Sequence, residues 1–518
     1  MLYNALTRHA GFFPDGLWTL IYVLWIVGGT VFLLLHRRRP TTMLAWLLAF
    51  WSVPILSGLA YFLFGPRRLD DEGKLRQRAR QAAARVVPPS AHDLPEDFIE
   101  NCSLASLARV TRSSVETESE SAPRRARSIE LYADGDGAFP AILKAIHEAT
   151  DTLHLEYYIW LPDGIGTEIR NAVIERARAG VTVRIVVDAL GSKDCGSSFW
   201  KPVVDAGGNV RQFNPPYPFK PQPGKLNFRT HRKIVIVDGH RAFTGGINIS
   251  DHNDTATGHD DKRAWRNTHL EIVGAPVRDL QAIFLEDWLY GLPIDAVEVG
   301  KRDARTRRPN NDEEPELPSD IDRWFPELSG SESEHDDGPW VQIIDSGPDE
   351  ADDDIHLLYF SAISCARERL WITTPYFIPD APIQTALESA VARGVDVRLI
   401  IPANSDSKIV EAAAKTFSTD VVRKGARIWR YGPRMNHSKT MIVDDGLAIV
   451  GTANMDNRSF RLNFEVVAAI YDRQITARVA DIFERDLADS TPYEPEGEDA
   501  GFVQRVITNT ARLLAPLL

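Results

Sequence analysis

Cysteine is scarce in this chain of 518 residues, and its three cysteines, Cys102, Cys195 and Cys365, stand far apart. Their odd number and wide spacing exclude a disulfide framework and a thiolate metal site, and they indicate free thiols in a reducing compartment. An excess of basic residues is also missing, because the formal net charge is −13 at pH 7. Since a nucleic-acid partner requires a basic surface, we expect none.

Basic residues are especially rare in one segment, which contains much of the negative charge. Between Asp312 and Asp337 there are eleven acids and a single base, Arg323. Proline and serine accompany the acids, a composition typical of an exposed segment without a core of its own. We therefore predict an acidic linker at residues 301–339.

Charge is absent from two long apolar runs near the N-terminus. Gly16 to Leu35 is twenty residues without a charge, and a second uncharged run extends from Thr41 to Phe64. Each run, as a helix, can span the roughly 30 Å of a bilayer's hydrocarbon core. No small-residue cleavage site follows the first run, which argues against a signal peptide. We predict a transmembrane hairpin of two helices at residues 1–70, and hence a multi-pass protein of the plasma or inner membrane.

The orientation of this hairpin is predicted from the basic residues beside it. The turn between the runs contains Arg37, Arg38 and Arg39. The opposite side contains the N-terminal amine, Arg8 and all six basic residues of the segment 67–80, namely Arg67, Arg68, Lys74, Arg76, Arg78 and Arg80. Because cytoplasmic loops carry the excess of Lys and Arg, the count favours a cytoplasmic catalytic portion.

The rest of the chain contains an internal duplication. In each copy a β-rich apolar run is followed by a helical span and a second apolar strand, the order of a βαβ unit. The three parts lie at 154–160, 166–179 and 181–188 in the first copy, and at 370–378, 383–392 and 395–402 in the second. We predict a juxtamembrane helix and linker at 71–127, a first lobe at 128–300 and a second lobe at 340–518. The second lobe ends in an amphipathic helix at 502–518, which we expect to pack on the core.

Each copy also contains the same spaced set of polar residues. Counted from a histidine, lysine follows at +2, aspartate at +7, glycine at +14 and asparagine at +17. The two sets are His231, Lys233, Asp238, Gly245 and Asn248, and His437, Lys439, Asp444, Gly451 and Asn454. A single histidine is usually a structural one, but two matches in identical register within a duplicated pattern are a strong functional signal.

Strand geometry predicts where these side chains point. Residues two apart in a strand share a face, so each histidine and its lysine are expected on the same side. The glycine pair Gly245 and Gly246, and the pair Gly451 and Thr452, are expected to allow a ligand close to the backbone. The amides of Asn248 and Asn454 can donate hydrogen bonds to phosphate oxygens. We predict that these six residues bind a phosphate group.

The paired set indicates phosphoryl transfer without a metal. Imidazole can act as a nucleophile at phosphorus or as a general acid, and lysine supplies positive charge to a phosphodiester and its transition state. Lysine is a poor metal ligand, so we expect neither a metal nor another cofactor. With the two copies face to face, one histidine attacks while the other protonates the leaving alcohol.

These residues resemble the paired HKD motifs of the phospholipase D superfamily. The resemblance to bacterial cardiolipin synthases covers nearly the whole chain, including TPYFIPD at 374–380, SGPD at 346–349, GTANMDNRSF at 451–460, NFE at 463–465 and LLAPLL at 513–518. The segment W-R-N-T-H at 265–269 is similar to the family's W-R-D-T-H, with Asn267 where an acid is usual. Thr452 stands where that family usually has serine.

The resemblance implies an α/β fold of two phospholipase D-like lobes with pseudo-two-fold symmetry and the active site between them. It implies transfer of a phosphatidyl group from one phosphatidylglycerol to another through a phosphohistidine, which makes membrane phospholipids the partners. His231 is then the nucleophile and His437 the general acid and base, with Lys233 and Lys439 holding phosphate. By the same resemblance Asp238 and Asp444 orient the imidazoles, and the supporting residues are His269, Asp456 and Glu465.

Three alternatives remain open on the sequence. A hydrolytic phospholipase D uses the same motifs and differs only in that water resolves the intermediate. A nuclease of the same superfamily is disfavoured by the acidic balance and the apolar runs, because it needs a basic groove. A non-catalytic membrane scaffold is disfavoured by the intact histidine, lysine and aspartate positions of both copies.

Overall fold

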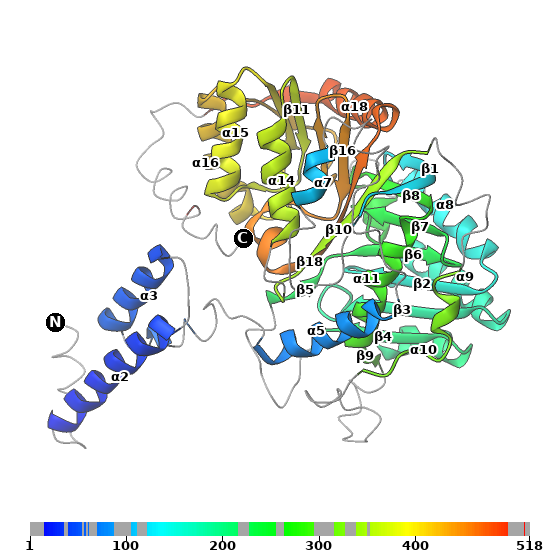
Figure 1. Cartoon of the computed structure of the whole chain (residues 1–518), viewed down its shortest axis with the longest axis horizontal. Helices are drawn as coiled ribbons and strands as arrows, with labels where there is room; N and C mark the ends of the chain where they lie inside the picture. Colours follow the sequence, from blue (N-terminus) through cyan, green and yellow to red (C-terminus); the bar gives the residue numbers. More distant parts are fainter. Residues whose placement is uncertain are drawn as a thin grey trace. The chain divides into compact units, whose positions relative to one another are not determined.

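The computed structural model describes residues 15–35, 40–53, 56–58, 61, 70–86, 105–110, 122–215, 227–254, 264–294, 315–326, 338–349, 353–495 and 512 (Figure 1). The chain divides into two units, Met1–Arg68 with Pro218–Asn227, and Leu69–Tyr217 with Phe228–Leu518. The amphipathic helix predicted at 502–518 lies outside the described residues, apart from Arg512.

The first unit contains the helices α2 (Asp15–Leu35) and α3 (Pro40–Ser52), which pack on each other through aromatic side chains. The rings of Trp25 and Phe50 meet edge to face with 5.7 Å between their centroids, and Phe32 contacts Tyr61 in the same manner. Among the described residues, whose side chains in α2 begin at Leu20, no helix combines the length and the apolarity needed to cross a membrane. The structure thus shows α2 and α3 packed on each other, and the membrane hairpin remains a prediction.

The first lobe of the second unit is built on one mixed sheet. Its strands lie in the order β1, β8, β7, β6, β2, β3, β4, β9, with only β2–β3 and β3–β4 parallel. Their bounds are β1 Arg124–Tyr132, β2 Thr152–Tyr157, β3 Thr182–Asp188, β4 Asn209–Phe213, β6 Lys233–Val237, β7 Arg241–Gly245, β8 His269–Gly274 and β9 Leu292–Pro293. Because β1 starts at Arg124, this lobe begins before the predicted boundary at residue 128.

The sheet of the second lobe repeats this plan strand for strand. Its order is β10, β18, β16, β15, β11, β13, β14, β19, and again only the pairs β11–β13 and β13–β14 are parallel. The bounds are β10 Trp340–Ser346, β11 Arg369–Thr373, β13 Asp396–Pro402, β14 Arg427–Tyr431, β15 Thr440–Val443, β16 Leu447–Gly451, β18 Asn463–Tyr471 and β19 Ser490–Pro492. The duplication predicted from the sequence is therefore a duplication of the whole sheet.

The helices of the two lobes also correspond in pairs. The first lobe has α8 (Gly135–Glu148), α9 (Gly164–Arg178), α10 (Ser197–Asp205) and α11 (Val277–Tyr290). Their counterparts are α14 (Asp354–Cys365), α15 (Ala381–Ala392), α16 (Lys408–Arg423) and α18 (Arg473–Ala488). Short elements complete the unit: α5 (Asp70–Ala84), α7 (Ala105–Val110), β5 (Arg229–Thr230), β12 (Phe377–Ile378), β17 (Met455–Asp456) and α17 (Asn457–Arg461), with 3₁₀ turns at Asp251–Asn253 and Ile321–Arg323.

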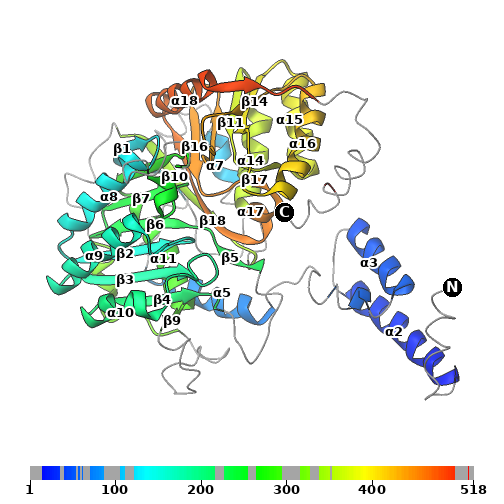
Figure 2. The ribbon, with the colours of Figure 1, turned by 180° about the vertical axis from the view of Figure 1, so that it is seen from behind.

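Apolar side chains form three large cores in this unit. Helices α8, α9 and α10 pack on the outer face of the first sheet, and α14, α15 and α16 pack on the outer face of the second. The third core joins the inner faces of both sheets with α5, α11 and α18 (Figures 1 and 2). The two lobes are thus joined through a continuous apolar core.

The motif strands are buried on both faces, which explains their uninterrupted apolar sequences. In β6, Val235 and Val237 face the core beneath α8 and α9, whereas Ile234 and Ile236 face the core shared by the lobes. The strand β15 alternates between two cores in the same way. A strand placed between two cores has a fixed register, since a slip by one residue would exchange its faces.

Part of the segment predicted as an exposed acidic linker is packed instead. Trp324 is fully buried, and its ring lies 4.1 Å from that of His154 between centroids. Asp320 accepts two hydrogen bonds from the guanidinium of Arg184, at 2.9 and 2.5 Å. The prediction of an exposed linker is therefore wrong for residues 315–326, because one buried tryptophan and one ion pair attach them to the first lobe.

Candidate active site

The backbone of each motif histidine is held by the opposite lobe. The N–H of His231 donates to the carbonyl of Phe464 at 2.8 Å, and the N–H of His437 donates to the carbonyl of Arg266 at 2.7 Å. The residue before each histidine is bridged to the same partner strand, Thr230 to Phe464 and Asn436 to Arg266. These reciprocal bonds bring the two motifs together at the junction of the lobes.

Each lysine folds back toward its own histidine. The ammonium groups of Lys233 and Lys439 donate to the carbonyl oxygens of His231 and His437, both at 2.6 Å. The histidines precede the regular strands, since β6 begins at Lys233 and β15 begins at Thr440. The predicted proximity of histidine and lysine is therefore present, although the histidine itself lies outside the strand.

His231 is paired with a carboxylate from the second lobe. Its Nδ1 lies 2.9 Å from Oε2 of Glu465, whose side chain is fully buried. Burial lowers the pKa of His231 to about 4, and Glu465 opposes part of that shift. A neutral His231 with its proton on Nδ1 donates to Glu465 and presents the Nε2 lone pair to the site. That is the state in which an imidazole is a nucleophile.

His437 has no carboxylate at the corresponding place. Its Nδ1 lies 3.2 Å from Nδ2 of Asn267 and 3.0 Å from Nζ of Lys439. Burial lowers the pKa of His437 well below its usual range, and the charges of Lys439, Lys233 and His231 lower it further. Because two of these groups belong to the first motif, this coupling indicates that the two motifs share one small site.

Burial also favours the neutral form of both lysines. It lowers the pKa of Lys233 to about 7, against the opposing charges of Glu465 and other acids, and it lowers the pKa of Lys439 strongly. A bound phosphodiester would add a negative charge within the site and raise the pKa of both lysines. The site is therefore electrostatically suited to an anion.

The two motif aspartates do not orient the imidazoles. Asp238 accepts hydrogen bonds from the backbone N–H groups of residues 150–152 and from the hydroxyl of Thr150. Asp444 accepts from the N–H groups of residues 367–369 in the same way. Both stand at the far end of the motif strand, seven residues from the histidine, which is about 23 Å of extended chain. The predicted orienting role is wrong, and Glu465 and Asn267 occupy that place instead.

The motif glycines make room for protein groups. A Cβ on Gly245 would lie 2.7 Å from the carbonyl of Thr268, and one on Gly246 would lie 2.0 Å from Oδ1 of Asn267. A Cβ on Gly451 would lie 2.5 Å from the carbonyl of Val466, with which the N–H of Thr452 forms a hydrogen bond of 2.9 Å. These positions thus serve close packing between strands, and their predicted contact with phosphate remains a prediction.

The two motif asparagines are buried beside the histidines. Asn248 is 2% exposed and accepts a long hydrogen bond from the N–H of Ile159, whereas Asn454 is 5% exposed. In the described part of the chain the side-chain oxygen of Asn454 has no hydrogen-bond partner. This oxygen is an acceptor like the phosphate oxygens, so the donation to phosphate expected from the NH₂ group of Asn454 remains a prediction.

The other supporting residues have distinct surroundings. His269 is fully buried, and neither of its ring nitrogens has a hydrogen-bond partner among the described residues. Burial, followed by the charge of Lys233, lowers the pKa of His269 to about 3. Asp456 caps α17 by accepting from the N–H of Ser459 at 2.7 Å, and burial raises its pKa to about 6.

Sequence reasoning did not assign two aromatic side chains at the site. Tyr158 meets the ring of His231 edge to face at 5.1 Å, and the ammonium group of Lys233 lies over its ring at 5.6 Å. Trp265 lies 4.8 Å from the ring of His437. Tyr158 comes directly after β2, the strand that pairs with the motif strand β6. The sequence indicated it through the run HLEYYIW, in which a tyrosine follows the apolar strand.

A buried ion network behind the first motif was also missed. Arg232, between the motif histidine and lysine, donates to Asp287 at 2.6 Å, and Asp287 also accepts from Arg76 of α5. Arg76 is 1% exposed and donates as well to Asp349 at 3.0 Å. A helix predicted as a juxtamembrane segment is therefore built into the wall behind His231. Only spatial proximity joins these residues, which lie far apart in the sequence.

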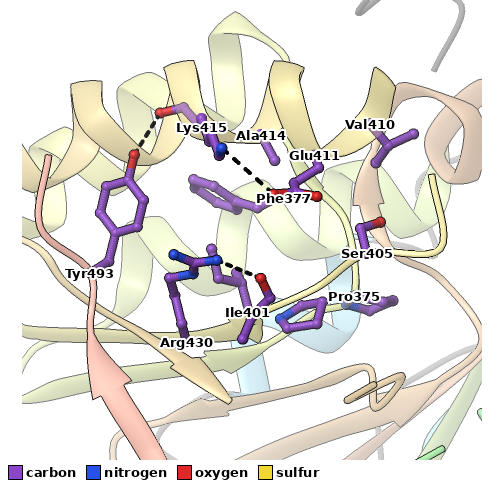
Figure 3. A pocket seen from close by; sticks show the side chains of 12 residues that line it. Pro375, Phe377, Ile401, Ser405, Val410, Glu411, Ala414, Lys415, Arg430 and Tyr493 are labelled. Atoms are coloured by element: carbon purple, nitrogen blue, oxygen red, sulfur yellow. Dashed lines mark hydrogen bonds and ion pairs between the residues drawn. The ribbon is translucent and has the colours of Figure 1, made fainter. Parts of the chain in front are cut away.

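The described pockets lie away from the two motifs. A cavity of about 30 Å³ lies beneath α16, where Lys415, Glu411 and Tyr493 surround Phe377 (Figure 3). A larger hollow of about 490 Å³ lies between β4, β9 and the segment 315–319. Neither has a motif residue in its lining. The active site is therefore located by the converging side chains of the two motifs.

Two H-x-K segments that face each other across duplicated α/β lobes define a site of the phospholipase D type. The family model "Cardiolipin synthase, PLD-like domain" matches residues 142–260 and 359–487, and each range contains one motif. In fold, the chain is similar to the crystal structure of a phosphatidylserine synthase from Haemophilus influenzae. The TM-score is 0.57 at 16% identity, and the match covers 76% of this chain and 97% of that one.

Relatives in sequence are more specific. The chain is 34% identical over 515 residues to cardiolipin synthase 1 of Bacillus cereus, which covers 97% of this chain and 94% of that protein. It is 33% identical over 519 residues to the major cardiolipin synthase of Bacillus subtilis, covering 96% and 98%. The chain belongs to the cardiolipin synthase family of the phospholipase D superfamily.

Proposed function

We propose that this chain is a phosphatidyltransferase that converts two phosphatidylglycerol molecules into cardiolipin and glycerol through a phosphohistidine. The observation that carries the proposal is the placement of His231 and His437, each bonded through its backbone N–H to the lobe of the other. Two imidazoles in one buried anion-binding site can divide nucleophilic attack and proton transfer between them. The family's name supports the choice of phosphatidylglycerol as substrate.

In the first step Nε2 of His231 attacks the phosphorus of the donor lipid. A nitrogen–phosphorus bond forms, the bond from phosphorus to the glycerol oxygen breaks, and His437 gives a proton to the departing oxygen. Glu465 accepts a hydrogen bond from Nδ1–H of His231, and its negative charge stabilises the positive charge that develops on the ring. Lys233 and Lys439, charged once the phosphate is bound, balance the negative charge of the transition state.

In the second step a hydroxyl of the acceptor phosphatidylglycerol attacks the phosphohistidine. His437 takes the hydroxyl proton, the nitrogen–phosphorus bond breaks, and neutral His231 is restored. Asn248 and Asn454 donate to the non-bridging phosphate oxygens in both steps. The acceptor alone separates transfer from hydrolysis, because water in its place would give phosphatidic acid.

Product analysis tests the proposal directly. The purified full-length chain in vesicles of phosphatidylglycerol should release glycerol and form cardiolipin in equal amounts, as measured by lipid mass spectrometry. The variant with both His231→Asn and His437→Asn serves as the control and should form neither product. Exclusive formation of phosphatidic acid would assign the chain as a hydrolase and overturn the proposed function.

We also propose that the apolar N-terminal runs anchor the chain in the membrane with a cytoplasmic catalytic portion. Several side chains of α2 are exposed, including Leu24 at 61% and Leu35 at 77%, as suits contact with lipid. An anchor of this kind would hold the chain on the membrane in which both substrates reside.

A reporter fused after Leu518 tests this orientation. A fusion active only in the cytoplasm is expected from the excess of basic residues on that side of the runs. A fusion active only in the periplasm would reverse the orientation. A chain recovered in the soluble fraction without detergent would remove the anchor altogether.

A further inference from the structure

The two histidines have partners at equivalent positions but of different chemistry. Gly245 pairs with His269 in the first lobe, and Gly451 pairs with Val467 in the second. Two residues before these partners stand Asn267 and Glu465. The pseudo-symmetry therefore places an amide against His437 where it places a carboxylate against His231.

The orientation of the Asn267 amide is fixed by its own hydrogen bonds. Its Oδ1 accepts from the backbone N–H of Thr268 at 3.1 Å. Its Nδ2 donates one hydrogen to the carbonyl of Gly246 at 2.8 Å, and its second hydrogen is shared by Oδ1 of Asn253 and Nδ1 of His437, each 3.2 Å from Nδ2. Rotating the amide by 180° would place its oxygen against the carbonyl oxygen of Gly246 and its NH₂ group against the N–H of Thr268, and both contacts would be repulsive. The NH₂ group therefore faces the imidazole of His437.

Nδ1 of His437 consequently meets two donors. Asn267 approaches it through Nδ2 at 3.2 Å, and Lys439 approaches it through Nζ at 3.0 Å. A nitrogen between two donors is an acceptor, so the neutral ring carries its proton on Nε2. The neutral ring of His231 has the opposite tautomer, because its Nδ1 faces the carboxylate of Glu465.

We propose that Asn267 is a positioning residue that makes the two histidines chemically unequal. It holds His437 with Nε2–H toward the reacting atoms and denies it the carboxylate that supports His231. When His437 gives its Nε2 proton to the leaving glycerol oxygen, the ammonium group of Lys439, 3.0 Å away, passes a proton to Nδ1, so that the ring stays neutral. The reverse transfer lets Nε2 take the proton of the acceptor hydroxyl and returns the Nδ1 proton to Lys439. This assignment of Asn267 rests on the proposed phosphatidyl transfer, within which it names the residue that separates the two roles.

The charges around His437 act in the same direction. The groups that act on His437 are Lys439 from its own segment, Lys233 and His231 from the first motif, and the carbonyl of Gly246. Arg266 and Asp486 form a separate ion pair with 2.8 Å between Nε and Oδ1, and Asp486 also accepts from Asn436. The cations lower the pKa of His437, and the Gly246 carbonyl raises it by accepting from the protonated ring. A phosphodiester between the motifs would raise the pKa of His437 at the moment when its proton is needed.

The first test uses no substrate. In the full-length chain labelled with ¹⁵N-histidine, the ring nitrogens of His231 and His437 are assigned by their loss in His231→Asn and His437→Asn. We expect neutral His437 as the Nε2–H tautomer and neutral His231 as the Nδ1–H tautomer. The same tautomer for both rings would overturn the proposal, whatever product the enzyme makes.

The second test restores the missing carboxylate. In Asn267→Asp, an acid within hydrogen-bond distance should raise the pKa of His437 by about 1–3 units, as an adjacent opposite charge generally does. The alkaline limb of kcat/KM against pH should move up by the same amount, and the ¹⁵N titration of His437 should move with it. Unchanged titration of His437 in a folded Asn267→Asp protein would contradict the proposal.

Two matched variants separate positioning from packing. Asn267→Ala removes the donor without adding a charge, so kcat should fall about ten-fold or more with KM and the alkaline limb in place, in line with the loss of an oriented proton donor. Glu465→Gln should change the tautomer of His231 and leave that of His437. Cardiolipin and phosphatidic acid are measured together, so a hydrolytic product would refute the proposed function while the tautomer result still decides the role of Asn267.

Discussion

The two halves of the site have the same backbone plan, and they differ in the groups that touch the imidazoles. Both histidines donate a backbone N–H to the other lobe, and both lysines fold back to the carbonyl of their histidine. Beside this common frame, His231 meets the carboxylate of Glu465 and His437 meets the amide of Asn267. Duplication thus supplies the geometry, and single side chains decide which half attacks and which half moves protons.

The residue between the histidine and the lysine of each motif is a second difference between the halves. In the first motif Arg232 enters a buried ion network with Asp287 and Arg76. At the same position of the second motif stands Ser438, which receives a hydrogen bond of 3.2 Å from the hydroxyl of Thr268. The first half is therefore fixed from behind by a network of several charges, one of which comes from the helix that follows the N-terminal apolar runs. Behind the second half lies the pair of Arg266 and Asp486 next to Asn436.

The largest expected effect comes from exchanging either histidine for asparagine. His231→Asn should abolish the covalent phosphatidyl-enzyme. His437→Asn should still form an adduct from a phosphatidyl-nitrophenol donor, because only acid assistance worth about 10²–10⁴-fold is lost. Mass spectrometry of acid-labile phosphohistidine measures both. An adduct on His437 in the first variant, and none in the second, would show that the roles are inverted.

The next largest effect is expected from making the two halves alike. Glu465→Gln places an amide against His231, as Asn267 stands against His437, and removes the negative charge that accepts its Nδ1 proton. Asn463 donates to the other oxygen of the carboxylate at 3.1 Å, so it should hold the amide oxygen on its own side and turn the NH₂ group toward His231. We expect kcat to fall about 10³–10⁴-fold, the size known for a triad aspartate replaced by its amide. The exposed Glu168→Gln on α9 is the control. A loss below ten-fold would mean that the carboxylate does not orient His231.

A smaller effect, on stability, tests the network behind the first motif. Arg76→Ala leaves Asp287 and Asp349 with fewer buried partners, and breaking such a pair costs about 3–5 kcal/mol. Ser438→Ala, its comparison in the second half, removes one hydrogen bond worth about 0.5–1.5 kcal/mol. Chemical unfolding of the full chain in detergent measures both, with exposed Gln77→Ala as the control. Equal losses at positions 76 and 438 would contradict the asymmetry.

The smallest effect concerns acid sensitivity. His269 has Val467 as its counterpart, and burial lowers the pKa of His269 to about 3. Because the unfolded chain binds this proton from about pH 6.5 downward, the buried neutral ring makes stability fall as pH drops toward the folded pKa. His269→Val should flatten that fall by about 1 kcal/mol per pH unit. The exposed control His147→Gln should leave the slope of stability against pH as it is. An unchanged slope in His269→Val would refute the assignment of His269 as a buried neutral ring.

Much of the fold was predictable because its signals are local. The βαβ units, the turn after each motif aspartate and the boundaries of β3 and β13 follow from apolar runs and glycines that the sequence displays directly. The packed segment around Trp324 was not predictable, since its acidic composition is that of a linker and only a distant arginine anchors it. The role of Asp238 was mistaken because motif spacing gives proximity along the chain and not the direction of a side chain.

By itself, the sequence determined the duplication, the paired histidines and lysines, and the class of chemistry, because these depend on residue type and spacing within short segments. Only the tertiary structure decided which side chain faces which imidazole. Glu465 lies 234 residues from His231, and Asn267 lies 170 residues from His437. Contacts across such separations arise when strands of two lobes pair and the lobes share a core, and no local pattern encodes them. The inequality of the two histidines is therefore a property of the folded pair of lobes.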